Sequence, residues 1–188
     1  MEKNKPMETL WKNVLFWGGL ALIAAGLAWL VGLGQTQPAP ERPPAPSLVL
    51  PDLEGETFRL ADHRGEVVLV NFWATWCPPC RKEMPSMQRL WEAWKGRPFR
   101  VVAVDVGEEE SAAWAFAATE DLTFTILLDN DSAVSRAWGV RGLPTTFLID
   151  PAGRIAFTAI GERTWDEPQM LQKMEALFLD DASRRSEP

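Results

Sequence analysis

The chain has 188 residues, of which 46% are hydrophobic, enough for one folded domain and an accessory segment. Its net charge of −7 and the lack of any basic cluster or basic aromatic groove argue against nucleic acid as a partner. A closed zinc site needs about four ligands, which two cysteines and one histidine do not supply, so we expect no metal.

An uncharged apolar stretch near the amino terminus predicts a membrane anchor at residues 13–33. Val14 to Leu33 is a nearly continuous run of 20 apolar or glycine residues. As a helix, such a run spans about 30 Å, the thickness of a bilayer core. A cleaved signal peptide has a shorter apolar region of about 7 to 15 residues, and no cysteine follows for lipoprotein processing. We therefore favour an uncleaved anchor over a removed signal peptide or a buried core helix.

The charges on either side of this stretch predict its orientation. Three lysines precede it (Lys3, Lys5 and Lys12), whereas Arg42 alone follows closely. By the positive-inside rule, residues 1–12 lie in the cytoplasm and the rest of the chain faces outward. The expected location is the cytoplasmic membrane of a bacterium, with the folded domain on the periplasmic side.

A proline-rich tether at residues 34–46 follows the anchor. It contains five prolines and no apolar periodicity, so we expect a semi-extended segment. At about 3.1 Å per residue, this tether reaches on the order of 40 Å. The folded domain is then expected at residues 47–180, with a frayed tail at residues 181–188. We expect only the anchor, residues 13–33, to contact the lipid bilayer.

Within the domain, strand and helix patterns alternate. Phe58 and Leu60 mark a short edge strand or hairpin, and the apolar run that starts at Val67 predicts a strand buried on both faces. The next apolar residues recur at helical spacing and end at Gly96: Cys80, Met84, Met87, Trp91 and Trp94. Further strands and helices predict an α/β fold with a parallel core: strands at 99–105 and 124–128, helices at 109–119 and 131–138.

The carboxyl-terminal part predicts antiparallel structure. Two strand patterns, Thr145 to Ile149 and Arg154 to Ile160, are joined by Asp-Pro-Ala-Gly, which suits a type I turn and hence a hairpin. A last helix is expected to begin at Thr-Trp-Asp-Glu, with a capping box from Thr164 to Glu167. Glu108 to Glu110 precede an earlier helix, and we expect them to interact only with its dipole.

The cysteine pair Cys77 and Cys80 directly follows the buried strand. Pro78 and Pro79 suit the first turn of a helix, so Cys77 should lie at a helix amino terminus. Unpaired N–H groups and the helix dipole there favour a thiolate, the reactive form of cysteine. A purely structural disulfide over so short a loop would constrain the unfolded chain only weakly. We therefore predict a redox-active dithiol with no other cofactor.

Two motifs carry a family resemblance. Trp-Cys-Pro-Pro-Cys at residues 76–80 and Leu-Pro-Thr-Thr-Phe-Leu-Ile-Asp at residues 143–150 together resemble the thioredoxin superfamily. The longer stretches around them are most similar to the membrane-anchored TlpA/ResA group, over residues 47–178. The resemblance implies a thioredoxin-like fold behind a single transmembrane helix. In that fold, helices flank a central mixed sheet that carries an amino-terminal strand or hairpin extension.

The same resemblance assigns site residues. Cys77 and Cys80 are the catalytic dithiol, and Glu83 matches a glutamate that lies near the dithiol of ResA-like proteins. Asn71 stands where thioredoxin itself has a buried aspartate, so the acid-base role of that aspartate does not carry over. Glu83 is about one turn from Cys80, close enough to exchange a proton, unless it is an ordinary first-turn glutamate. Substrate-binding residues are implied at the motif and around a cis-proline: Trp76, Pro78, Pro79, Leu143, Pro144 and Thr145.

The resemblance implies an outward-facing thiol-disulfide oxidoreductase that reduces protein disulfides. Its implied substrates are apocytochrome c or copper-site assembly proteins, and its implied electron donor is a membrane protein of the CcdA/DsbD type. A peroxiredoxin-type peroxidase is excluded, because Val70 and Ala74 stand where its P-x-x-x-T-x-x-C motif has proline and threonine. A Sco-like copper carrier needs Cys-x-x-x-Cys and a later histidine, which the chain lacks. A non-catalytic adaptor for cysteine-containing partners stays open.

Overall fold

A five-stranded mixed sheet forms the centre of the part that the computed structural model describes, residues 42–185. In the order β5-β4-β3-β6-β7, the first three strands run parallel to one another. β6 is antiparallel to β3, and β7 is antiparallel to β6. All seven residues of β3 are buried, as its continuous apolar run predicts. The strands are β3 (Val67–Trp73), β4 (Phe99–Val106), β5 (Thr125–Asp129), β6 (Thr145–Ile149) and β7 (Ile155–Ile160).

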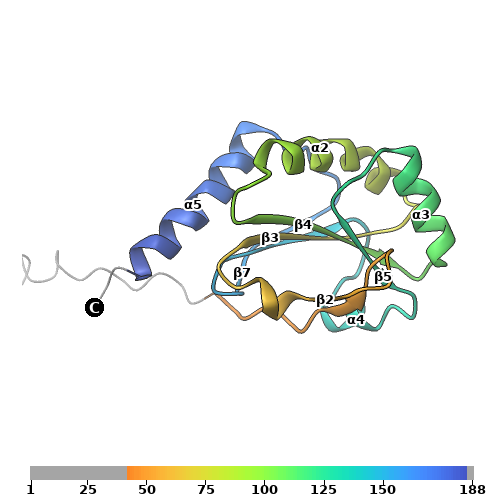
Figure 1. Ribbon diagram of the computed structural model, residues 1–188, viewed down its shortest axis with the longest axis horizontal. Helices are drawn as coiled ribbons and strands as arrows, with labels where there is room; N and C mark the ends of the chain where they lie inside the picture. Colours follow the sequence, from red (N-terminus) through yellow and green to blue (C-terminus); the bar gives the residue numbers. More distant parts are fainter. Residues whose placement is uncertain (1–41, 186–188) are drawn as a thin grey trace, which may run out of the picture. The chain divides into compact units, whose positions relative to one another are not determined.

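Helices cover both faces of the sheet (Figure 1). In that view α2 and α3 lie above the sheet, and α4 lies below it with a separate two-stranded hairpin, β1–β2. The hairpin is the amino-terminal extension that the sequence resemblance implied. The mixed sheet with flanking helices confirms the predicted thioredoxin-like α/β fold. These elements are β1 (Val49–Pro51), β2 (Thr57–Arg59), the 3-10 turn η1 (Leu60–His63), α2 (Pro78–Trp94), α3 (Glu110–Thr119), α4 (Ala133–Ala137) and α5 (Pro168–Arg185).

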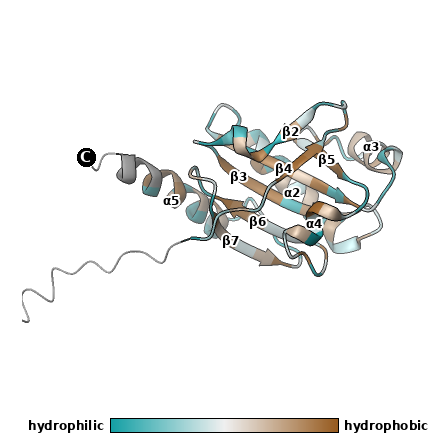
Figure 2. Cartoon of the chain, turned by 90° about the horizontal axis from the view of Figure 1, so that it is seen from below, coloured by the Kyte–Doolittle hydropathy of each residue, from teal (hydrophilic) through white to brown (hydrophobic). Residues whose placement is uncertain are grey.

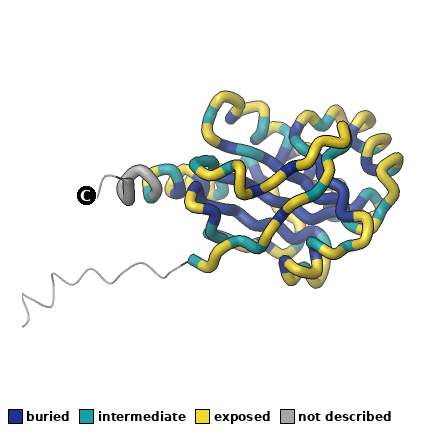
Figure 3. The backbone as a smooth tube through the Cα atoms, turned by 60° about the horizontal axis from the view of Figure 1, so that its bottom comes forward, coloured by how far each residue is buried: buried dark blue, intermediate teal, exposed yellow. Residues whose placement is uncertain are grey.

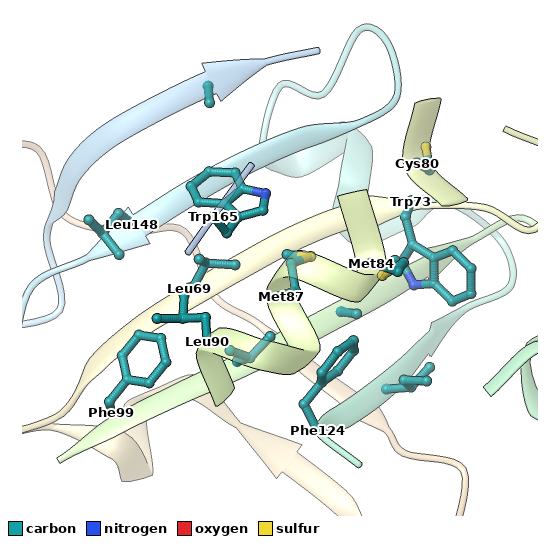
Figure 4. Packing of buried hydrophobic residues seen from close by; sticks show 14 of the residues in the cluster. Leu69, Trp73, Cys80, Met84, Met87, Leu90, Phe99, Phe124, Leu148 and Trp165 are labelled. Carbon is teal, nitrogen blue, oxygen red and sulfur yellow. The ribbon is translucent and has the colours of Figure 1, made fainter. Parts of the chain in front are cut away.

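An apolar layer packs on each face of the sheet. Successive side chains of β3 point to opposite faces, so the strand contributes to both layers. Leu69 and Trp73 face the layer that contains Met84 of α2, and Figure 4 shows these side chains packed between helix and strands. Val70 and Phe72 face the opposite layer. The hydrophobic residues in Figure 2 and the buried residues in Figure 3 both concentrate on the central strands. The end of β3 is therefore fixed from both sides before the cysteine motif begins.

The last helix begins later than the sequence predicts. α5 starts at Pro168 rather than at Thr164, and the carbonyl of Glu167 accepts its first hydrogen bonds. Proline suits that first position because its missing N–H would have no partner there. The stretch before α5 packs against α2 instead. Trp165 is 1% exposed, and its backbone N–H donates to the Ser86 hydroxyl of α2 at 3.0 Å. The predicted capping box is therefore wrong.

Two of the segments predicted to flank the domain, the tail at residues 181–188 and the tether at residues 34–46, overlap the residues that the structure describes. α5 continues to Arg185, so residues 181–185 belong to this helix, and the frayed tail at residues 181–188 stays a prediction. At the other end, the last part of the predicted tether is bound to the domain, because the Ile155 N–H donates to the Pro43 carbonyl at 2.8 Å. Prolines permit this contact, since they lack the N–H but keep the carbonyl acceptor.

The predicted cytoplasmic segment at residues 1–12 and the predicted anchor at residues 13–33 lie outside the described residues. The same holds for the tether as far as residue 41 and for the last three residues of the chain. Within residues 42–185, no helix combines the length and the apolar character that a membrane crossing requires. The anchor and its orientation stay predictions from the sequence.

Candidate active site

The active-site loop, residues 74–77, connects the end of β3 to the start of α2. The Cys77 N–H donates to the Ala74 carbonyl at 3.2 Å, which closes the loop as a turn. Cys77 is the N-cap of α2, and its Sγ accepts the N–H of Cys80 at 3.3 Å. The two cysteines form a disulfide with their Cα atoms 5.3 Å apart. The predicted dithiol thus lies at a helix amino terminus.

The two sulfurs differ in their environments. Both cysteines are buried, but Cys77 is the N-cap of α2, whereas Cys80 lies within the apolar stripe of that helix. Pro78 and Pro79 occupy the first helical positions and have no N–H, so the Cys80 N–H is the first donor that the helix offers. That donor and the helix dipole both favour negative charge on the Cys77 sulfur after reduction. The geometry favours Cys77 as the nucleophile.

Three of the predicted substrate-binding residues surround the cysteines at the surface. Trp76 precedes Cys77 in the active-site loop and is 67% exposed. Pro78 is exposed and Pro79 is half-buried. A large apolar indole left in water beside the reactive sulfur suits contact with a partner protein.

The other three flank the Leu143–Pro144 peptide bond, which is cis, as the resemblance implied. Phe72 pairs with Thr145, so the start of β6 lies beside the end of β3 from which the active-site loop leaves. Pro144 and Thr145 are buried and Leu143 is half-buried, so the segment can meet a substrate chiefly through its backbone. The Pro144 carbonyl already accepts the Gly161 N–H at 2.9 Å.

Glu83, the predicted proton-transfer residue, is 1% exposed on α2, one turn beyond Cys80. Its Oε1 accepts a hydrogen bond from Asn71 Nδ2 at 2.7 Å. Its Oε2 accepts the backbone N–H of Arg163 at 3.0 Å and the indole N–H of Trp165 at 3.2 Å. Burial raises the pKa of Glu83 to about 7, although these hydrogen bonds oppose the rise. Glu83 is therefore no exposed first-turn glutamate, and it can hold or release a proton near neutral pH.

Sequence reasoning did not predict the three residues that donate hydrogen bonds to Glu83, of which Asn71 and Trp165 do so through their side chains. Asn71 is fully buried in β3, and its amide also donates to Thr146 Oγ1 at 2.8 Å. Asn71 therefore belongs to the site as a hydrogen-bond donor, although it cannot act as an acid. Trp165 lies in the stretch that resembled a helix cap, and nothing in the sequence pattern distinguishes it from an ordinary core tryptophan.

Glu108 does not act as the helix-dipole residue that the sequence suggested. α3 begins at Glu110, with Glu109 as its N-cap. Glu108 instead binds the active-site loop: its Oε2 accepts the Thr75 N–H and its Oε1 accepts the Thr75 hydroxyl, both at 2.6 Å. The chain turns toward the loop at Gly107, whose φ of 74° is a conformation that glycine adopts without strain.

The reactive groups gathered here are a disulfide and a buried carboxyl. Reducing the disulfide consumes two electrons and two protons and leaves two thiols. Glu83 lies on the same helix one turn from Cys80, and its carboxyl can hold or release a proton near neutral pH. Among residues 42–185, no three or more histidine, cysteine, aspartate or glutamate side chains form a group that could bind a metal ion.

Residues 42–158 match the model of the AhpC/TSA family. The chain belongs to this family. It is 44% identical over 123 residues to the thiol-disulfide oxidoreductase ResA of Geobacillus thermodenitrificans, which covers 65% of this chain and 71% of that protein. It is 41% identical over 120 residues to ResA of Bacillus subtilis, with 64% and 67% covered.

A solved structure supports the same assignment. The crystal structure of a Chlorobium tepidum protein assigned as the thiol:disulfide interchange protein DsbE is similar, with a TM-score of 0.68 and 34% identity. The match covers 75% of this chain and 99% of that one. This AhpC/TSA protein is thus a thiol-disulfide oxidoreductase of the ResA/DsbE type, as the motifs predicted, and its cysteine pair is Cys77 and Cys80.

Proposed function

We propose that this oxidoreductase works as a reductant of protein disulfides. The observation that carries this direction is the buried Glu83 carboxyl, one turn from Cys80. An ionised carboxylate near a thiol disfavours the thiolate because like charges repel, whereas a disulfide carries no charge. Oxidants of this class depend on a stabilised reduced form. Glu83 acts in the opposite sense, so it favours the disulfide and makes the dithiol a stronger reductant.

In the proposed reaction, the Cys77 thiolate attacks one sulfur of a substrate disulfide, and the other substrate sulfur leaves as a thiolate that takes a proton. The Glu83 carboxylate accepts the proton of the Cys80 thiol. The Cys80 sulfur then attacks the Cys77 sulfur, which closes their disulfide and releases the second substrate thiolate. Glu83 or water returns a proton to that thiolate. Two electrons reach the substrate, and the enzyme is left in the disulfide form described above.

The proposed cellular setting is the periplasmic side of a bacterial cytoplasmic membrane. It is supported by the uncharged run at residues 13–33 and by the lysines before it. A reductant in an oxidising compartment needs a source of electrons, and the TlpA/ResA resemblance suggests a membrane donor of the CcdA/DsbD type. The same resemblance suggests apocytochrome c or copper-site assembly proteins as substrates.

Protease accessibility tests this topology. Protease added to intact spheroplasts should degrade the folded domain, while a cytoplasmic protein in the same sample stays intact as the control. A domain that stays protected until the membrane is lysed would overturn the outward orientation.

Trapping tests the proposed reaction in cells. A Cys80→Ser variant stalls after the first step, so mixed disulfides through Cys77 should accumulate and disappear when a small thiol is added. The double variant with Cys77→Ser is the matched control and should trap nothing. The identity of the trapped proteins decides between cytochrome and copper-site substrates. If the full-length chain with both cysteines fails to reduce insulin disulfides, the reductase proposal is wrong and the adaptor function is favoured.

A further inference from the structure

A second pair of carboxyls lies at the carboxyl end of β4, apart from the Glu83 site. Asp105 is 1% exposed, and no N–H or O–H group of the described residues donates a hydrogen bond to either of its carboxyl oxygens. A buried carboxylate with no donor is unfavourable, so the group has to be neutral or to share a proton. Glu108 follows three residues later, beyond the turn at Gly107.

The sheet places Asp105 next to the residues that lead into the active-site loop. Its register partner on β3 is Trp73, the last residue of that strand. Paired residues on neighbouring strands point to the same face, and Trp73 belongs to the apolar layer that contains Cys80. Figure 4 shows the Trp73 ring beside the start of α2, close to Cys80. Asp105 thus lies at the edge of the redox site.

Glu108 links Asp105 to the loop. Both Glu108 oxygens bind Thr75, at 2.6 Å to its N–H and 2.6 Å to its hydroxyl. Burial raises the pKa of Asp105 to about 8; the Glu108 charge adds to the rise, and so does a hydrogen bond to Glu108 that only a protonated Asp105 can donate. A protonated Asp105 can donate its O–H to the Glu108 carboxylate, which supplies the partner that an ionised Asp105 lacks.

We propose that Asp105 and Glu108 are positioning residues for thiol-disulfide exchange: a carboxyl pair with one shared proton that fixes the active-site loop through Thr75. Thr75 precedes Trp76 and Cys77, so a change in its hydrogen bonds alters how these residues meet a substrate. The proposal depends on the exchange activity, and it is independent of the direction of electron flow and of Glu83.

Glu108 is the charged group that acts on Asp105, since the other residues around Asp105 are uncharged, shielded or exposed to solvent. Its register partners, Trp73 on β3 and Leu128 on β5, do not titrate. From α2, the Arg81 guanidinium lies over the Phe116 ring, 5.7 Å from its centroid. Phe116 packs on Trp73 with ring centroids 5.0 Å apart, so an aromatic ring lies between this cation and the strand. At the start of α3, Glu109 and Glu110 are exposed to solvent.

Nuclear magnetic resonance of the full-length chain tests the shared proton directly. The side-chain carboxyl carbon of Asp105 should titrate near pH 8, and the Thr75 amide proton should lie at low field because of its short bond to a carboxylate. Asp105→Asn keeps a donor toward Glu108, so the Thr75 amide should stay at low field. Glu108→Gln should move that amide upfield. Glu109→Gln is the matched control and should leave both signals unchanged.

Kinetics test the positioning role. Thr75→Val removes one bond to Glu108 without changing any charge, and it should slow reduction of insulin disulfides by roughly five- to tenfold. Thr75→Ser keeps the hydroxyl and should restore the rate. The double variant with Glu108→Gln should be no slower than the slower single variant, because both act through one contact.

Two outcomes would overturn the proposal. One is an Asp105 carboxyl carbon that is already ionised well below neutral pH. The other is a Thr75→Val variant that reduces insulin at the parent rate. A parent protein without exchange activity would instead contradict the assigned reaction, and the resonance experiments would still decide whether the carboxyl pair shares a proton.

Discussion

Asn71 Nδ2 donates a hydrogen bond to Glu83 Oε1 at 2.7 Å, and both residues are almost fully buried. The contact joins β3 to α2 one turn from Cys80. A donor to a carboxylate stabilises its ionised form, so Asn71 opposes the burial that raises the pKa of Glu83 to about 7. The residue that replaces the aspartate of thioredoxin therefore tunes an acid on the neighbouring helix.

Asn71→Leu should raise the pKa of Glu83 further. The change removes the amide donor with little change in volume, and loss of a hydrogen bond to a charged group corresponds to about one pKa unit. Titration of the Glu83 carboxyl carbon by nuclear magnetic resonance measures the shift. Thr146→Val is the matched control, because it removes the other Asn71 contact and leaves Glu83 its donor. An unchanged pKa in Asn71→Leu would contradict this account.

Glu83→Gln should slow the reduction of a model disulfide by at least about tenfold, because a positioned proton acceptor typically contributes that much or more. The inflection near pH 7 in the rate should disappear with the titrating group. Glu92→Gln makes the same change on the exposed surface of α2 and should leave rate and pH profile unchanged. If Glu83→Gln keeps the parent rate and pH profile, solvent handles the protons.

The same substitution should change how stability depends on pH. The folded state raises the pKa of Glu83 from 4.5 to about 7, so the folded protein binds this proton more tightly than the unfolded chain does. Its contribution to the free energy of unfolding is therefore largest at low pH and falls as the pH rises through about 7. Glutamine does not titrate. Between pH about 5 and about 8, the stability of Glu83→Gln relative to the parent should increase by roughly 2 kcal/mol.

Urea denaturation of both proteins at the two pH values measures this difference. Asp105 titrates in both and cancels from the comparison. A relative stability that stays constant between the two pH values would show that Glu83 is ionised throughout, and hence that burial does not raise its pKa.

The strand, loop and helix around Cys77 could be predicted because the signals are local. The apolar run predicts a buried strand, and Pro78 with Pro79 predicts the first turn of a helix. The six-residue spacing from Asn71 to Cys77 also showed that the aspartate of thioredoxin is absent. Each inference needed only neighbouring residues, and the geometry of the active-site loop agrees with it.

The partners of the carboxyls could not be predicted, because they come from distant parts of the chain. Trp165 is 82 residues from Glu83, and Thr75 is 33 residues from Glu108. A sequence pattern shows that Glu108 precedes a helix, but only the packed fold shows that it turns toward the active-site loop. The pKa of Glu83 depends on burial, which is a tertiary property.

The asymmetry of the cysteines leads to the last prediction. After reduction, Cys77 should react with an alkylating reagent near neutral pH at least about tenfold faster than Cys80. Cys77 has the Cys80 N–H and the helix dipole to stabilise its thiolate, whereas Cys80 lies in the apolar stripe of α2 and one turn from the Glu83 carboxyl. The apolar surroundings and the Glu83 carboxyl both raise the free energy of the Cys80 thiolate.

Mass spectrometry of the labelled peptides distinguishes the two sites, and each single variant provides a control. Cys80→Ser leaves Cys77 alone and should be labelled at a rate close to that of the parent. Cys77→Ser leaves Cys80 alone and should be labelled slowly until the protein is unfolded, after which the two rates should converge. Convergence would show that the fold, and not the local sequence, sets the difference. Faster labelling of Cys80 in the folded protein would reverse the assigned roles, because the attacking thiol has to be the one that carries the thiolate.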